Sequence, residues 1–238
     1  MKKLIYMALA LIAFGFMSVK FMGIDSFDWV YMLARIAVLT YASARCFKRA
    51  LRLGDRDALF TGALGLGVLT MSEIFLFAKT LAGERGQGGL IISDYSDAGS
   101  YLFFLAVTAM LLIPPVKWEK ALRAGMTAAS GVIILVTLYS VLVNSEKLLY
   151  ITVAATALLC VLLSAYLLAQ TRRVRLLKTA ARFAASMIFL GVLDLALYLL
   201  AFFGNLHAAG VLASLYLPSF FFIGEGLMRL RGEENRHG

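Results

Sequence analysis

The chain has 238 residues, of which 61% are hydrophobic and 16% charged, and its formal net charge is +9. Its charged residues gather between long apolar runs, which excludes a soluble globular domain and predicts a polytopic membrane protein. The basic loops contain neither interleaved aromatic residues nor a nucleic-acid-binding motif. We therefore attribute the positive charge to membrane topology and anionic inner-leaflet lipids, with no nucleic acid as partner.

Eight apolar stretches are long enough to cross a bilayer as helices. The first has the charged start of a secretory signal, but no small-x-small cleavage site follows, so we expect a retained helix. We predict an all-α fold with a single transmembrane domain over 1–238, ending in a polar tail at 232–238. In chain order the predicted spans are 4–22, 28–47, 58–79, 96–113, 121–143, 148–170, 179–203 and 208–228.

Lysine and arginine gather in alternate connections, and this asymmetry sets the predicted orientation. We place the amino terminus, with Lys2 and Lys3, in the cytoplasm together with four further basic segments. An even number of spans then places both termini in the cytoplasm. The four segments are 45–56, 116–123, 171–182 and 229–236.

Several side chains lie near the predicted ends of spans. Trp29 and Tyr31 are expected at the outer interface, where amphipathic rings are favoured. Lys20 is expected to extend its ammonium group toward the same interface. Near the inner end of the last span, Glu225 is expected to pair with Arg229, one helical turn away.

The cysteine and histidine content excludes several kinds of site. Cys46 at a cytoplasmic helix end and Cys160 inside a span are unsuited to a structural disulfide in a reducing compartment. His207 and His237 are the only histidines, so a zinc site built from histidines is not expected. Phosphate-binding, metalloprotease and serine-hydrolase motifs are absent from the sequence, and we predict no cofactor.

The two halves of the chain, at 1–115 and 116–231, show the same succession of features. In each, a basic loop precedes an apolar span with one acid, and a glycine-containing outer turn leads to a span that opens near a tyrosine. Because each half holds four spans, an even number, we predict a parallel four-plus-four repeat. The matched residues are Glu73 with Asp194 and Tyr101 with Tyr216.

Three ionisable residues share one depth in their spans. Arg35, Glu73 and Asp194 each lie seven to nine residues from the predicted outer end of a span, roughly 10 to 14 Å inside. A charge at this depth is costly, so we predict that Arg35 pairs with Glu73, Asp194 or both. One arginine cannot neutralise two carboxylates, which leaves open that one acid is protonated. The predicted polar cleft opens outward and is lined by Tyr41, Tyr101, Tyr198 and Tyr216.

Three roles for these charges stay open: fixing helix register, binding a ligand, cation or proton, and catalysis. The spans also carry small residues on one face, for which close helix packing is the first interpretation and homodimerisation the second. These small residues are Gly62, Ala63, Gly65 and Gly67 in the first half and Gly125, Ala129 and Gly131 in the second.

The segment "YSDAGSYLFFLAVTAMLLIPP" resembles the fourth span of the eight-span N-terminal sensor module of bacterial signalling proteins with diguanylate cyclase or kinase output domains. The resemblance rests on Ser96, Asp97, Tyr101 and Leu102 and extends to the last two spans. It implies an inner-membrane sensor and adds Asp97 to the ligand-binding residues. Only "GEENRHG" follows Arg231, so we expect no output domain in this chain.

The acids also resemble those of the lysoplasmalogenase (YhhN) family, eight-span enzymes that cleave the vinyl ether of lysoplasmalogens. Ser72-Glu73 and Leu193-Asp194 stand where that family has Gly-Asp and Ser-Asp, and Tyr216 matches a later tyrosine. The resemblance implies Glu73 and Asp194 as general acid and base. The family's glutamine and fourth-span histidine have no counterpart.

From these features we expect a non-enzymatic multi-pass module in the cell inner membrane. It would sense an outer ligand or lipid, or serve as the membrane subunit of a larger complex with a cytoplasmic partner protein. Intramembrane hydrolysis of lysoplasmalogen and transport of a small solute or ion are the alternatives. The predicted ligand-binding residues are Arg35, Glu73, Asp97, Tyr101, Asp194, Tyr198 and Tyr216.

Overall fold

The structure, a computed structural model, describes residues 2–22, 28–53, 57–82, 92–112, 132, 135, 146–173 and 175–230. All regular elements within these ranges are helical, which confirms the predicted all-α class. They are α1 (Lys2–Phe21), α2 (Asp28–Leu53), α3 (Asp57–Leu81), α4 (Ile92–Leu112), α6 (Glu146–Arg173), the 3₁₀ helix η1 (Arg175–Ala180), α7 (Ala181–Phe202), α8 (Leu206–Ala213) and α9 (Tyr216–Leu227).

Five helical segments of the described chain are long and apolar enough to span a bilayer, so this is a multi-pass membrane protein by helix length and hydropathy. A helix suits this setting because it satisfies its own backbone hydrogen bonds without water. The five segments are Asp28–Arg52, Asp57–Leu81, Ile151–Arg172, Lys178–Leu200 and His207–Leu227.

Three of the eight predicted spans are not among these five segments. The first and fourth fall on α1 and α4, whose apolar stretches, Ala8–Lys20 and Ser96–Leu112, are shorter than the five candidate spans. The fifth predicted span, 121–143, lies outside the described residues apart from two isolated positions.

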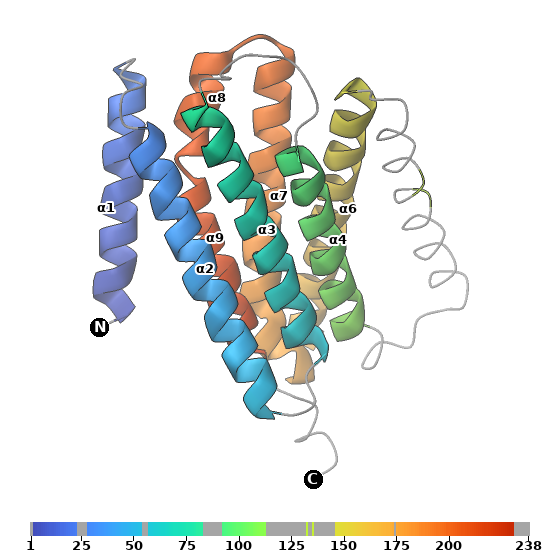
Figure 1. Cartoon of the computed structure of the whole chain (residues 1–238). Helices are drawn as coiled ribbons and strands as arrows, with labels where there is room; N and C mark the ends of the chain where they lie inside the picture. Colours follow the sequence, from blue (N-terminus) through green and yellow to red (C-terminus); the bar gives the residue numbers. More distant parts are fainter. Residues whose placement is uncertain are drawn as a thin grey trace.

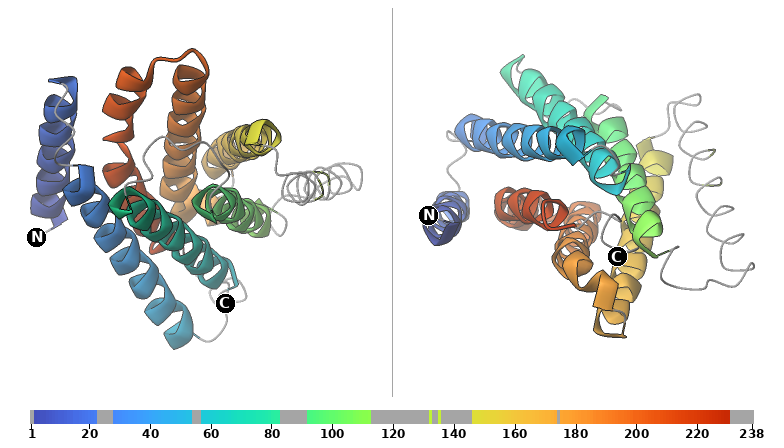
Figure 2. Two further views of the ribbon diagram at one scale, coloured as in Figure 1. Left: turned by 45° about the horizontal axis from the view of Figure 1, so that its top comes forward. Right: turned by 90° about the horizontal axis from the view of Figure 1, so that it is seen from below.

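Six helical elements form a closed ring of neighbours. Going around it, α2 packs against α3, α3 against α4, α4 against α6, α6 against α7, α7 against α9, and α9 returns to α2. The view along the bundle in Figure 2 shows this ring, with α1 standing outside it beside α8 and α9. Figure 1 shows that α1 begins and α9 ends at the same, lower end of the bundle.

Glycines allow the helices of the ring to approach closely. A Cβ atom on Gly224 of α9 would lie 2.7 Å from the Cβ of Ala42 in α2, and one on Gly226 would lie 2.7 Å from the Cα of Phe183 in α7. A Cβ on Gly62 of α3 would overlap the side chain of Leu227. The predicted small-residue face of the first half therefore serves packing within the chain, while Gly125, Ala129 and Gly131 lie outside the described residues.

The last predicted span is broken into α8 and α9 at residues 214–215. Pro218 explains the break, because proline has no N–H to donate to the carbonyl of Ser214 four residues earlier. A proline is tolerated here because it lies in the first turn of the new helix, where backbone N–H groups have no partner within the helix. The last predicted span therefore consists of two helices, α8 and α9, with a two-residue turn between them.

Candidate functional site

Arg35 and Glu73 form a buried ion pair between neighbouring helices. Nη2 of Arg35 in α2 donates a hydrogen bond to Oε1 of Glu73 in α3. Both residues are less than one-tenth exposed. The structure thus contains the predicted partnership of Arg35 with Glu73. Each partner offsets the desolvation of the other, because an unpaired charge in this position would be far more costly.

Asp194 of α7 is held by neutral donors. The hydroxyl of Tyr101 in α4 donates to its Oδ2 atom, and the hydroxyl of Tyr216 in α9 donates to Oδ1. Its side chain is buried, so it does not face lipid alone. Both carboxylate oxygens of Asp194 are therefore hydrogen-bonded, although the ion pair with Arg35 is formed by Glu73.

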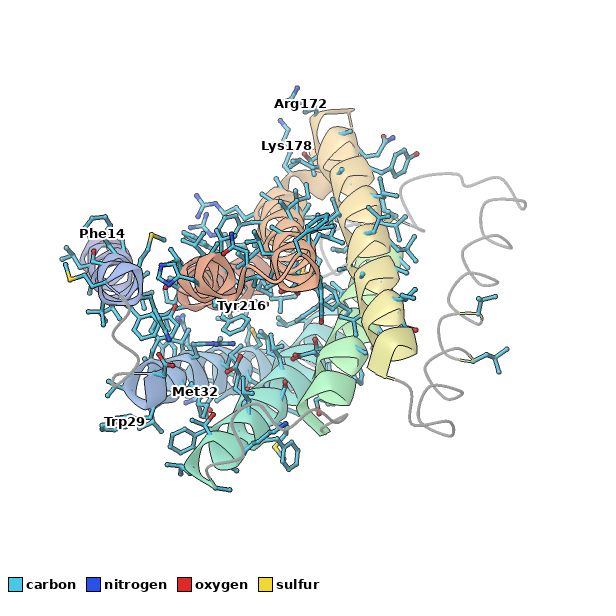
Figure 3. All side chains as sticks on the ribbon, turned by 90° about the horizontal axis from the view of Figure 1, so that it is seen from above. Phe14, Trp29, Met32, Arg172, Lys178 and Tyr216 are labelled. Atoms are coloured by element: carbon cyan, nitrogen blue, oxygen red, sulfur yellow. The ribbon has the colours of Figure 1, made fainter. Side chains whose placement is uncertain are left out.

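Tyr216 connects the two acids. The guanidinium of Arg35 lies over its ring, 4.6 Å from the centroid, and over the ring of Phe220 at 5.6 Å. These distances are within the range of cation–π attraction. Figure 3 shows Tyr216 directed into the space enclosed by the ring of helices. We call Arg35, Glu73, Asp97, Tyr101, Asp194 and Tyr216 the polar cluster.

Asp97, in the second turn of α4, completes this cluster. The Ser72 hydroxyl is hydrogen-bonded to the Asp97 side chain, which lies within electrostatic range of Glu73, Asp194 and Arg35. The cluster of described residues thus holds three carboxyl groups and one guanidinium. If all were ionised its net charge would be −2, a strong attraction for a cation or proton.

Two polar atoms of the cluster have no hydrogen-bond partner among the described residues. They are Nε of Arg35 and Oε2 of Glu73, and both are shielded from solvent. Buried polar groups are normally paired, and each exception needs a physical explanation, of which a bound water or ion is one. The ion pair therefore presents one further donor and one further acceptor within the bundle.

Tyr31 joins α2 to the break between α8 and α9. Its hydroxyl donates to the carbonyl of Ser214 and accepts a hydrogen bond from the backbone N–H of Leu217 at 3.2 Å. The first of these backbone groups is the carbonyl that Pro218 leaves without a helical donor. The Tyr31 side chain is buried and stacks on Phe16 at 4.0 Å. The expected place of Tyr31 at the outer interface stays a prediction.

Two predicted cleft tyrosines differ in their surroundings. Tyr198 packs against the buried pair Ala98 and Val153 and lies within electrostatic range of Tyr216. Tyr41 is 52% exposed, and Arg45, one turn along α2, lies over its ring at 5.3 Å. Tyr41 is therefore not part of the polar cluster, because six residues along α2 carry it about 9 Å away from Arg35.

Charged side chains nearer the lower end of the bundle join the same helices. Glu225 of α9 is paired with Arg45 of α2 at 3.4 Å, a partner from another helix instead of the expected Arg229. Arg49 donates to the carbonyl of Met228. At the opposite end, Lys20 pairs with Asp28 at 2.6 Å across the turn from α1 to α2.

The sequence did not indicate Phe220 or the role of Tyr31, and it gave Ser72 only as the neighbour of Glu73 in a family resemblance. Phe220 follows Tyr216 by four residues on α9, so the two rings stack at 5.4 Å. Tyr31 had no such signal, because its partner backbone groups lie 183 and 186 residues away.

The described residues contain no group of three or more histidine, cysteine, aspartate or glutamate side chains placed to hold a metal ion. Both cysteines are buried, and neither forms a disulfide. In the comparisons with known proteins, no family model, curated protein or solved structure matches the chain.

Proposed function

We propose that this protein is a non-enzymatic membrane module that binds a small cationic ligand at the polar cluster and transmits the binding event along the bundle. The observation that carries the proposal is the excess of acid over base: Glu73, Asp97 and Asp194 surround the single cation Arg35. Ionisable groups inside a membrane bundle are costly and commonly mark a functional site.

A purely structural ion pair would need one acid. Asp194 adds a second carboxyl whose oxygens receive two tyrosine hydroxyls, and Asp97 adds a third beside Ser72. The free Oε2 of Glu73 is a ready acceptor for an N–H donor of a ligand. The aromatic rings of Tyr216 and Phe220 already lie against one cation, and such rings suit organic cations well.

The proposed transmission follows α2 and α9. These helices meet at the polar cluster through Arg35 and Tyr216, and they meet again farther along at Arg45 and Glu225. A ligand that changes the first contact would shift the second, because both lie on the same pair of helices. On the proposed orientation the second contact lies on the cytoplasmic side, where a signalling protein or a larger complex would receive the change.

The proposed parallel repeat gives this path a symmetry. Exchanging the two halves exchanges α2 with α6 and α4 with the α8–α9 span. It therefore exchanges the α2–α9 contact with the α4–α6 contact, and both contacts occur in the ring. The acids differ in their partners, since Glu73 has the arginine and Asp194 has the two tyrosines.

Transport of a small cation is a second candidate, favoured by the break between α8 and α9. Interrupted helices at membrane depth commonly form the substrate sites of secondary transporters. Tyr216 opens α9 directly after this break and contacts Asp194. A moving cation would thus meet an acid beside the two-residue turn, at 214–215, that separates α8 from α9.

The test is calorimetric titration of the purified full chain with choline, ethanolamine and spermidine. We expect at least one of these to bind, and we expect Asp194→Asn to weaken that binding at least tenfold. Asp57→Asn is the matched control, since it removes an exposed acid at the start of α3, outside the polar cluster and outside the α2–α9 contacts. Failure of all three cations to bind, or equal affinity of wild type and Asp194→Asn, would refute the proposal.

Two further measurements separate the alternatives. Uptake of the bound cation into proteoliposomes, lost in Asp194→Asn, would favour transport over sensing. Release of aldehyde from lysoplasmalogen by wild type, lost in Glu73→Gln and Asp194→Asn, would show an enzyme and overturn the non-enzymatic proposal.

A further inference from the structure

A groove of about 540 Å³ runs along the outside of α7 and α9, away from the polar cluster. On α7, Ala185 and Asp194 are nine residues apart, which is roughly 180° around the helix, so groove and cluster occupy opposite faces. The groove is lined by Arg182, Ala185, Ser186, Phe189, Phe222, Glu225 and Gly226.

Small residues form the floor of the groove and aromatic rings form its walls. Ala185 and Gly226 leave the space open, and Gly226 brings α9 against the backbone of Phe183. Phe189 and Phe222 remain 39% and 41% exposed beside it. In a membrane such a surface is covered by hydrocarbon, and a groove between two rings suits an acyl chain better than a flat helix face does.

The charge at one end of the groove is positive. Arg182 is exposed at the start of α7, and the salt bridges found among the described residues do not include it. Glu225, the acid that also lines the groove, is already paired with Arg45 of α2. The unmatched charge is therefore the guanidinium of Arg182, which favours a phosphate with several acceptor oxygens.

We propose that this groove binds an anionic glycerophospholipid, with its phosphate on Arg182 and one acyl chain between Phe189 and Phe222. Arg182 precedes Phe189 by seven residues, about 10 Å along α7, which matches the spacing between a headgroup phosphate and the upper part of its acyl chain. A chain runs parallel to α7 in this arrangement, as lipid chains run across a leaflet. The site is independent of the proposed cation site and of its ligand.

Native mass spectrometry of the full chain released from nanodiscs tests this proposal. Nanodiscs with equal amounts of phosphatidylglycerol and phosphatidylcholine should yield protein that retains phosphatidylglycerol preferentially. Arg182→Gln should reduce that preference about fivefold, the effect expected for one basic residue at the membrane surface. Arg172→Gln is the matched control, because Arg172 is an exposed arginine of α6 outside the groove lining (Figure 3).

A second variant tests the acyl-chain part without touching a charge. Ala185→Trp should fill the groove and lower retention of both phospholipids, while thermal stability stays near that of wild type because the position is exposed. Equal retention of the two lipids by wild type, or unchanged retention by both Arg182→Gln and Ala185→Trp, would overturn the proposal. The cation titration uses other variants, so either proposal can be refuted without affecting the other.

Discussion

Removal of the Tyr31 hydroxyl tests how the broken last span is stabilised. In the structure this oxygen serves the carbonyl of Ser214 and the N–H of Leu217, and both residues are fully buried. Tyr31→Phe would leave both backbone groups without a partner where water does not reach. Each unsatisfied group costs about 1 to 3 kcal/mol, so we expect the free energy of unfolding to fall by about 2 to 6 kcal/mol.

A double-mutant cycle between Tyr31→Phe and Pro218→Ala tests this expectation further. In Pro218→Ala, residue 218 gains an N–H that can donate to the Ser214 carbonyl as in a continuous helix. Tyr31→Phe should then cost about half as much, because only one backbone group loses its partner. The assay is reversible unfolding in mixed detergent micelles, with Tyr41→Phe on the same helix as a control expected to stay within about 0.5 kcal/mol of wild type. Equal costs of Tyr31→Phe in both backgrounds would refute the reasoning.

Two further predictions concern burial and packing. Arg35→Met should destabilise the protein by about 3 to 5 kcal/mol because it leaves the Glu73 carboxylate buried without its cation, and the double variant with Glu73→Leu should recover most of this loss. A double variant no more stable than Arg35→Met would contradict that account. Gly226→Ala should cost about 1 to 3 kcal/mol because its Cβ would lie 2.7 Å from the Phe183 backbone, whereas Gly67→Ala, with a hydroxyl 3.6 Å away, should change the melting temperature little. Similar melting temperatures for the two glycine variants would show that the close approach is unimportant.

The sequence could predict three of the six members of the polar cluster from their depth in the spans. Arg35, Glu73 and Asp194 lie at similar distances from span ends, and charges at that depth need partners. Depth could not tell which acid takes the arginine, because that depends on the order of helices around the ring. Since α2 adjoins α3, Arg35 pairs with Glu73. Asp194 on α7 accepts hydrogen bonds from Tyr216 of α9, its neighbour in the ring, and from Tyr101 of α4, which lies beyond α6.

Local sequence did not indicate that Tyr31 is buried, and it placed Tyr41 in the polar cleft, which is wrong. Both are tyrosines on α2, and a hydropathy pattern cannot distinguish the face that packs against α9 from the face that meets lipid. Tyr31 faces the break in the last span and is buried, whereas Tyr41, ten residues later on the same helix, is half exposed beside Arg45. Tyrosine suits both settings because its ring is apolar and its hydroxyl is polar, so the residue type does not indicate which of the two is buried.

By itself, the sequence determined that this is an all-α, multi-pass membrane protein, because long apolar segments have no other stable structure in a bilayer. It also determined which ionisable groups lie at membrane depth. Only the tertiary structure decided the partners of each charge, the closure of six helical elements into a ring and the use of Tyr31 to satisfy the break at Pro218. These features depend on contacts between residues far apart in the chain, which composition and periodicity do not encode.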